Sequence, residues 1–209
     1  MQALRDARKI VRSIEEIGFE MRPGPLCEYE HMGGLLCDVI LQAGLNYESV
    51  VLPRIRHVVE KYPAARETLN FYDVIQTVGP STVLKWRHHE KPRRLMGLTF
   101  FFVAQNVNTI PELKQWLSCL ENLCRLKLVR GMGPKSVDYM CCLAGIQTVA
   151  VDRHLMTFLE NLGVVNQSYD YAKMVISFAA DFMEVPRRDL DQSIWYYMSS
   201  NLKIDSVTR

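Results

Sequence analysis

The sequence predicts an all-α protein built from two helical lobes. Apolar residues recur at every third or fourth position along nearly the whole chain, which is the periodicity of amphipathic helices. No convincing run of residues alternates between apolar and polar, as a half-buried strand would. The chain has 209 residues, of which 48% are hydrophobic and 23% charged, and this is typical of a soluble globular protein with one domain or two small lobes.

The first helices follow from apolar spacing and from residues that begin or end helices. Apolar side chains at helical spacing predict a helix over 3–18, which ends near Gly18. Residues 33–43 are apolar enough to form a buried helix. Asn46 is a suitable N-cap for a helix over 47–62, and the proline inside this range predicts a kink or a later start.

Proline and glycine set the bounds of the middle helices. A short element over 71–78 is stopped by the Gly-Pro pair that follows it, and Ser81 can cap the next helix. Prolines that suit a first helical turn predict further helices over 92–106 and 111–126.

A tight turn over 128–136 joins two helical patterns, and the second pattern continues from 134 to 144. A short connector over 146–151 follows. The remaining helices are predicted over 153–162, 169–182 and 186–201.

Charge and cysteine content exclude several classes of protein. The 25 lysines and arginines exceed the 23 acidic residues by only two, so any anion site must come from local clustering. No apolar run approaches the roughly 18 residues of a membrane span, and the charged start lacks the apolar core of a secretory signal. The six cysteines match no zinc pattern. We therefore expect free thiols in a reducing intracellular compartment, in the cytoplasm, nucleoid or nucleus.

The turn between the two helical patterns is the most informative segment. Gly131 and Gly133 allow positive φ or the close approach of another backbone, and Pro134 suits the first turn of a helix. The free N–H groups at this helix start would bind an anion such as a DNA phosphate. Residues 125–135, which include most of the turn, contain no acid and four basic residues: Arg125, Lys127, Arg130 and Lys135. The alternative is a plain joint between two helices.

Two motifs, whose Lys135 and Asp152 are 17 positions apart, carry a family resemblance. The first is Val129-Arg130-Gly131-Met132-Gly133-Pro134-Lys135, and the second is Val151-Asp152-Arg153-His154. Together they resemble the helix-hairpin-helix (HhH-GPD) superfamily of DNA glycosylases, the relatives of endonuclease III. No cysteine follows Cys142, so the chain looks like an endonuclease III-like member without the iron–sulfur cluster.

The resemblance implies a single two-lobed helical domain with its helix-hairpin-helix at about 116–144. We expect one lobe over about 30–135, and a second that combines the N-terminal helix with about 136–209. The implied activity is base-excision DNA repair, in which the enzyme removes a damaged or mispaired base from double-stranded DNA. We expect a monomer that does not bind membranes.

The resemblance assigns the chemistry to Lys135 and Asp152. A carboxylate at Asp152 would stabilise the oxocarbenium-like transition state at the sugar C1′. The Lys135 amine would attack C1′, form a Schiff base and promote β-elimination, which is AP-lyase activity and goes with oxidised bases. A helix N-terminus disfavours the ammonium form and so assists this attack. Lys135 could instead only contact phosphate, and we expect Asp152 to cap a helix as well.

Further site residues come from position in the family pattern. The implied DNA contacts are Lys127, Arg130, Gly131 and Gly133, and Gln42 is the candidate to fill the gap left by the flipped base; its alternative is to cap a helix end. The basic run 85–94 would contact phosphates or form a solvated loop. The family's hairpin also implies a monovalent cation on the backbone carbonyls of Lys127, Val129 and Met132, and no other cofactor. His154 would brace its loop.

Two other functions remain open from the sequence. The chain could be a monofunctional glycosylase for alkylated or mismatched bases, in which Lys135 contacts only phosphate. It could also be a DNA-binding helical module that keeps the hairpin and performs no catalysis.

Overall fold

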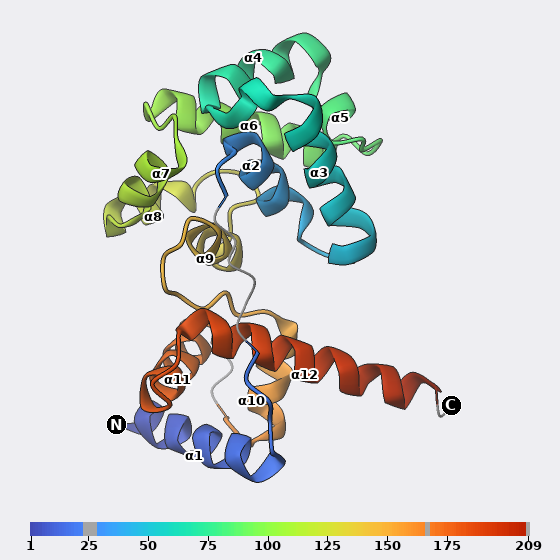
Figure 1. Cartoon of the computed structure of the whole chain (residues 1–209). Coiled ribbons are helices and arrows are strands. Elements are labelled where there is room, and N and C mark those ends of the chain that lie inside the picture. The colour runs from blue at the N-terminus through green and yellow to red at the C-terminus, as the bar shows by residue number, and fades with distance from the viewer. Residues whose placement is uncertain (23–28, 166–167, 208–209) are drawn as a thin grey trace. The chain divides into compact units, whose positions relative to one another are not determined.

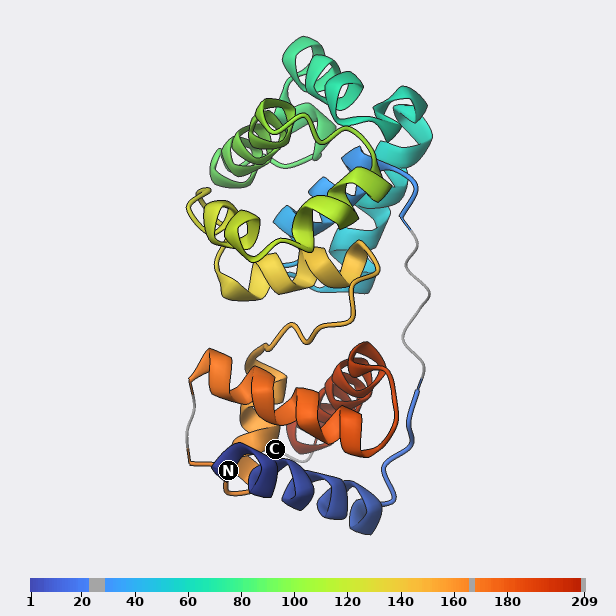
Figure 2. The same cartoon turned by 90° about the vertical axis from the view of Figure 1, so that its left-hand side faces the viewer.

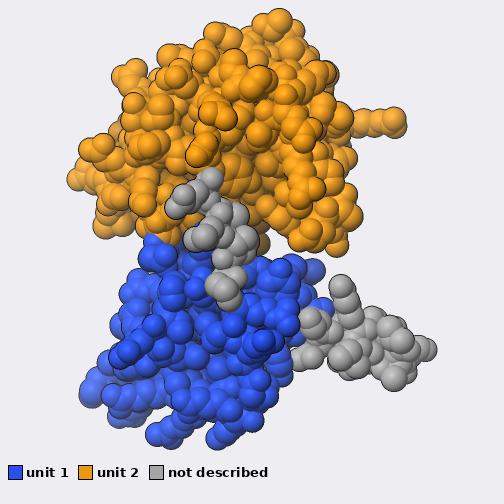
Figure 3. Space-filling model, viewed as in Figure 1, with its two compact units in different colours: residues 1–26, 147–209 blue, residues 27–146 orange. Residues whose placement is uncertain are grey.

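In this computed structural model the chain forms two compact units, residues 27–146 and residues 1–26 with 147–209 (Figure 3). The structure describes residues 1–22, 29–165 and 168–207, and of residues 200–207 only the backbone. Every regular element within these ranges is helical and none is a strand, so the predicted all-α class is confirmed.

The unit of residues 27–146 is built around one buried helix, α2 (Met32–Leu41). All ten residues of α2 are buried, as the sequence predicted. Figure 1 shows α2 among the other helices of this unit, and it packs against several of them. These other helices are α3 (Leu52–Lys61), α4 (Thr68–Val78), α5 (Pro80–Val83), α6 (Glu90–Ala104), α7 (Ile110–Leu117), α8 (Leu120–Leu126) and α9 (Pro134–Leu143).

Small residues let α2 lie at this centre. A Cβ atom on Gly33 would lie 2.7 Å from the ring of Phe71 on α4, so only glycine permits this close packing. The His31 side chain accepts a hydrogen bond from the N–H of Gly34 and so caps the start of α2. The core of the unit therefore forms against a helix that has almost no solvent-exposed face.

The predicted helix over 47–62 begins late, which confirms one of the two outcomes expected from its proline. Asn46 accepts a hydrogen bond from the N–H of Ser49 at 2.9 Å and caps a π-helical turn, Tyr47–Val51. Pro53 then lies in the first turn of α3. The prediction for Ser81 was wrong, because the preceding Gly79 is the N-cap of α5.

The single helix predicted over 111–126 is two helices, α7 and α8. Cys119 has extended backbone angles, and the side-chain amide of Asn122 donates to the Trp116 carbonyl at 2.9 Å across the break. Polar side chains thus satisfy the groups that the interruption frees. The helix–turn–helix at the hairpin consists of α8 and α9 and starts later than the predicted residue 116.

The other unit contains α1 (Gln2–Ile17), α10 (Arg153–Asn161), α11 (Tyr169–Phe182) and α12 (Arg187–Val207). In Figure 2, α1 runs alongside α11. Apolar residues of α1 such as Ile10 and Ile14 are buried in a core shared with α10, α11 and α12. The Tyr171 hydroxyl donates to Asp6 at 2.6 Å and adds a polar contact between α11 and α1.

The division between the units lies after Ile146, eleven residues beyond the lobe boundary expected at about 135. Helix α9 belongs with residues 27–146 because Val137, Met140 and Leu143 lie in that unit's core. The start of the hairpin's second helix and the Asp152 loop are therefore in different units.

No helix in the described part of the chain is long and apolar enough to cross a membrane. The cysteines within these residues, Cys37, Cys119, Cys124, Cys141 and Cys142, form no disulfide with one another, and Cys27 lies outside them.

Candidate active site

The hairpin turn between α8 and α9 is a compact structure held by its own backbone. The N–H of Val129 donates to the Leu126 carbonyl at 3.0 Å, and the N–H of Met132 donates to the Val129 carbonyl at 2.9 Å. Met132 is 1% exposed and anchors the turn in the core, whereas Leu128 at its tip is 87% exposed. The turn is therefore fixed on one side and open to solvent on the other.

The two glycines of the turn have different roles. Gly131 has φ of 90°, which favours glycine, and an added Cβ atom would lie 2.6 Å from the Arg94 side chain, which would have to shift. Gly133 has ordinary extended angles, and its added Cβ atom would meet nothing within 4 Å. The space beside Gly133 is open to the close approach of another molecule's backbone.

Helix α9 starts with its first N–H groups uncapped. Gly133 is the N-cap and offers no side-chain hydrogen bond, while Pro134 takes the first position as predicted. Lys135 is the second residue of α9 and half-buried, and its amine makes no hydrogen bond or ion pair with any described residue. Lys127 in the turn is exposed. The helix start thus combines free N–H donors with cationic side chains, which is the chemistry of an anion site.

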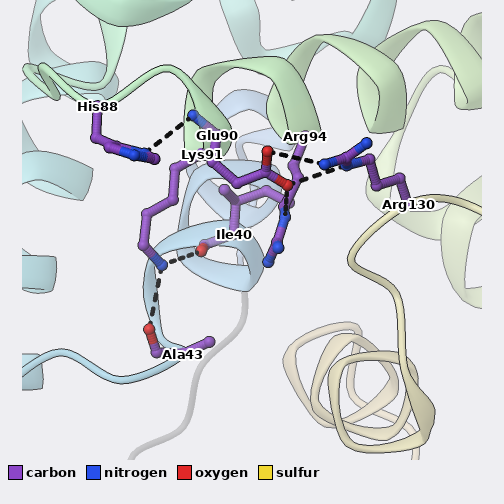
Figure 4. Close-up of polar contacts among 7 residues, drawn as sticks. All are labelled: Ile40, Ala43, His88, Glu90, Lys91, Arg94 and Arg130. Atoms are coloured by element: carbon purple, nitrogen blue, oxygen red, sulfur yellow. Dashed lines mark hydrogen bonds and ion pairs between the residues drawn. The ribbon is translucent and has the colours of Figure 1, made fainter.

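Arg130 is already paired with an acid of the protein. Its guanidinium donates to both carboxylate oxygens of Glu90, at 3.0 and 3.1 Å, and Glu90 also accepts from Arg94 at 2.9 Å (Figure 4). Hydrogen bonds from Arg130 and then Arg94 lower the pKa of Glu90 to about 2. The side chain expected to face DNA therefore has its charge compensated. Glu90 is the lone acid in the basic run 85–94, and no local signal predicts its partner 40 residues away.

Lys91, the next residue of α6, contacts the end of α2. Its amine donates to the carbonyls of Ile40 at 2.8 Å and Ala43 at 3.1 Å (Figure 4). Burial, and then the charge of Arg94, lower the pKa of Lys91. The Trp86 ring lies 5.9 Å from this amine and 5.4 Å from the guanidinium carbon of Arg54. Lys91 thus caps α2 rather than being free for phosphate.

The rest of the basic run remains open to solvent. Lys85, Arg87 and Arg93 are exposed, and no described residue pairs with them. The run is therefore divided, with part of it packed against the protein and part available to an anionic partner.

Gln42 lies at the C-terminal end of α2. Its backbone N–H donates to the Asp38 carbonyl at 2.9 Å, which places it at the C-cap. Its side-chain Nε2 is buried without a hydrogen-bond partner among the described residues. This position matches the helix-end alternative, and the gap-filling role stays a prediction.

Asp152 is the N-cap of α10, as expected. Its Oδ1 accepts hydrogen bonds from the N–H groups of His154 at 2.8 Å and Leu155 at 3.1 Å. The His154 ring packs edge-on against Trp195, with ring centres 6.0 Å apart, and its bracing role stays a prediction. Asp152 belongs to the unit of α1 and α10–α12 and Lys135 to the other unit, so each is placed within its own unit.

The predicted cation site consists of backbone carbonyls in one turn. The Val129 carbonyl accepts the N–H of Met132, which leaves it one lone pair for a cation. Among the described residues no group of three or more His, Cys, Asp or Glu side chains could hold a metal ion. The site on Lys127, Val129 and Met132 stays a prediction.

Comparisons with known proteins support this fold. Residues 102–199 match a family described as a domain of unknown function, DUF8548. No curated protein sequence matches the chain. A solved structure of similar fold is the 3-methyladenine DNA glycosylase MagIII of H. pylori bound to 1,N6-ethenoadenine. The TM-score is 0.59 at 14% identity, over 94% of this chain and 98% of that chain. The chain therefore shares the helical fold of this DNA glycosylase.

Proposed function

We propose that the protein is a base-excision DNA glycosylase with AP-lyase activity, in which Lys135 is the nucleophile. The observation that carries the proposal is the start of α9, where an amine without a partner among the described residues lies beside uncapped N–H groups and open space at Gly133. The glycosylase fold and the Asp152 N-cap support it.

The hairpin is proposed to hold the DNA backbone. A phosphate beside Gly133 would accept hydrogen bonds from the first N–H groups of α9, and the helix dipole adds to this attraction. Lys127 at the start of the turn and Arg125 in the last turn of α8 are exposed and supply positive charge. The partner is accordingly double-stranded DNA that contains a damaged or mispaired base.

The proposed chemistry takes place at the sugar C1′. As the bond from C1′ to the base breaks, the bonding electrons leave with the base, and positive charge grows on the sugar. The Asp152 carboxylate stabilises that charge. The Lys135 amine gives up a proton as it forms the new bond to C1′, and the departing base takes up a proton. The ring oxygen is protonated as the sugar opens to a Schiff base, and loss of a C2′ proton in the β-elimination then breaks the 3′ phosphodiester.

The decisive test is borohydride trapping on a duplex with one abasic site. Borohydride reduces the Schiff base, so attack is recorded as a covalent adduct of protein and DNA. We expect an adduct with the wild type and with Lys127→Ala, and none with Lys135→Ala. An adduct that survives Lys135→Ala, or a wild type that binds the duplex and forms none, would contradict the proposed nucleophile.

A monofunctional glycosylase for alkylated bases is the second candidate. It is favoured by the similar structure, which is named as a 3-methyladenine DNA glycosylase and is bound to 1,N6-ethenoadenine. In this case a water molecule would attack C1′, and Lys135 would contact phosphate. Lys135→Gln should then retain base release from a duplex with 1,N6-ethenoadenine, measured by strand cleavage in hot alkali.

A non-catalytic DNA-binding module is the third. In that case neither assay detects a reaction, and Asp152→Asn leaves duplex binding unchanged.

The lead proposal has four further parts, each of which rests on the sequence. These are the absence of an iron–sulfur cluster, the endonuclease III-like subtype, the monomeric state and an intracellular location.

A further inference from the structure

A carboxylate without solvent exposure lies inside the unit that contains Lys135. Asp38 on α2 is 0% exposed and accepts hydrogen bonds from three tyrosine hydroxyls. Tyr29 donates to Oδ2 at 2.7 Å, Tyr47 donates to Oδ2 at 3.3 Å, and Tyr139 donates to Oδ1 at 3.1 Å. We call these four residues the Asp38 cluster.

Burying the Asp38 carboxylate costs free energy of folding. Burial raises the pKa of Asp38 to about 6, and the three hydroxyl donors act in the opposite direction by favouring the charged form. The other nine residues of α2 are apolar or glycine, so Asp38 is the one charged residue of the helix. An apolar residue here would avoid the cost of burying a charge. This cost points to a role for the acid beyond stability.

Two of the tyrosines come from segments of the candidate active site. Tyr139 lies four residues after Lys135 on α9, so both side chains lie on the same face of the helix. Tyr47 begins the π-helical turn after the segment that contains Gln42, and such turns are frequent at functional sites. Tyr29 comes from the chain before α2 and belongs to neither segment.

We propose that Asp38 is a positioning residue, which fixes residues 42–47 against the Lys135 face of α9 through Tyr47 and Tyr139. Asp38 itself touches no DNA, because it has no exposed surface. Its role is to hold two half-buried aromatic side chains, from two different elements, in one fixed arrangement. This inference rests on the proposed glycosylase function.

The three tyrosines provide matched variants on one carboxylate. Tyr47→Phe and Tyr139→Phe should each lower the single-turnover rate of borohydride trapping by about tenfold, because a small misplacement of reacting groups costs about this much or more. The dissociation constant for the abasic duplex should change by less than about twofold. Tyr29→Phe removes the shortest hydrogen bond and should leave the trapping rate within about twofold of the wild type.

Tyr171→Phe is the remote control, since it removes a comparable Tyr–Asp hydrogen bond from the other unit. Circular dichroism and thermal melting establish that each variant is folded. Three cluster variants that slow trapping equally, in step with lost stability, would show that the cluster is structural only. Unchanged rates for Tyr47→Phe and Tyr139→Phe would also overturn the proposal.

The outcome for the wild type separates this inference from the function on which it rests. Where the wild type forms no adduct but releases 1,N6-ethenoadenine, the same variants are compared by the rate of base release. Where it does neither, the proposed function fails and the positioning role fails with it. A reactive wild type with fully reactive Tyr47 and Tyr139 variants overturns the inference alone.

Discussion

Glu90 compensates the positive charge of two arginines beside the hairpin turn. Its carboxylate accepts from Arg130 and from Arg94, and Arg94 in turn packs against Gly131. A carboxylate held by two guanidiniums resembles the arrangement in which arginines bind a phosphate. Under the proposed DNA contact, a phosphate would therefore have to replace Glu90 on Arg130.

Glu90→Gln should strengthen the binding of undamaged duplex and make it more dependent on salt. Each arginine released to contact a phosphate steepens the plot of log K against log salt concentration by about 0.9. We expect a slope steeper by about 1, measured by fluorescence anisotropy at several salt concentrations. Glu121→Gln on α8 is the control, because it removes the same charge from an exposed side chain without releasing an arginine. Equal slopes in the two variants would argue against this role of Glu90.

Among the helices, the start of α10 combines a structural and a proposed chemical role in one side chain. Oδ1 of Asp152 accepts two backbone N–H groups that would otherwise be unpaired. An asparagine at this position can still accept those hydrogen bonds, but it has no charge. Substitution can therefore separate the cap from the charge.

Asp152→Asn should keep the free energy of unfolding within about 0.5 kcal/mol of the wild type, while Asp152→Ala should lose about 1 kcal/mol through the missing cap. Both should lower the rate of base release by at least about a hundredfold, because the developing charge loses its carboxylate. Chemical denaturation and single-turnover assays measure the two effects. An active Asp152→Asn variant would remove Asp152 from the proposed mechanism.

Over the whole molecule, two carboxyl groups make the stability depend on pH in opposite directions. Burial raises the pKa of Asp38 from 3.8 to about 6, so the folded protein binds this proton more tightly than the unfolded chain does. Arg130 and Arg94 lower the pKa of Glu90 from 4.5 to about 2, so the unfolded chain binds that proton more tightly. The contribution of Asp38 to stability thus falls as the pH rises from about 4 to 6, and that of Glu90 falls as the pH drops from about 4.5 to 2.

The difference in the free energy of unfolding between the wild type and Asp38→Asn isolates the first effect. We expect the value for the wild type minus that for Asp38→Asn to decrease by up to about 3 kcal/mol as the pH rises from 4 to 7, because burial destabilises the charged form of Asp38. Urea denaturation at several pH values measures it. If this value instead increases with pH, the three tyrosine hydrogen bonds lower the pKa of Asp38 by more than burial raises it.

Local sequence signals predicted the helices and their ends well where the cause is local. Asn46 and Asp152 cap helices, and Pro134 starts one, because each of these preferences depends on backbone groups a few residues away. The break between α7 and α8 was not predicted, since apolar spacing continues across it and Cys119 carries no strong signal for an extended backbone.

The contacts that tie the candidate site together could not be predicted in this way. Asp38 meets Tyr139 across 101 positions of sequence, and Arg130 meets Glu90 across 40. Pairings of this kind depend on how the helices pack, and one sequence does not record it. A charged residue within the otherwise apolar α2 was the one available signal for the Asp38 cluster.

Two cations lie close to the Trp86 ring, which makes this residue an optical reporter. The charges of Lys91 and Arg54 lie over the indole, and Lys91 is also bound to the carbonyls at the end of α2. Movement of the chain there would displace a charge beside the ring and shift its fluorescence emission. Trp116 of the same unit packs edge-on against Phe101 and Phe102, with no cation over its ring among the described contacts. The chain has two other tryptophans, Trp116 and Trp195, so the emission of Trp86 can record events at the end of α2 once these two are replaced by phenylalanine.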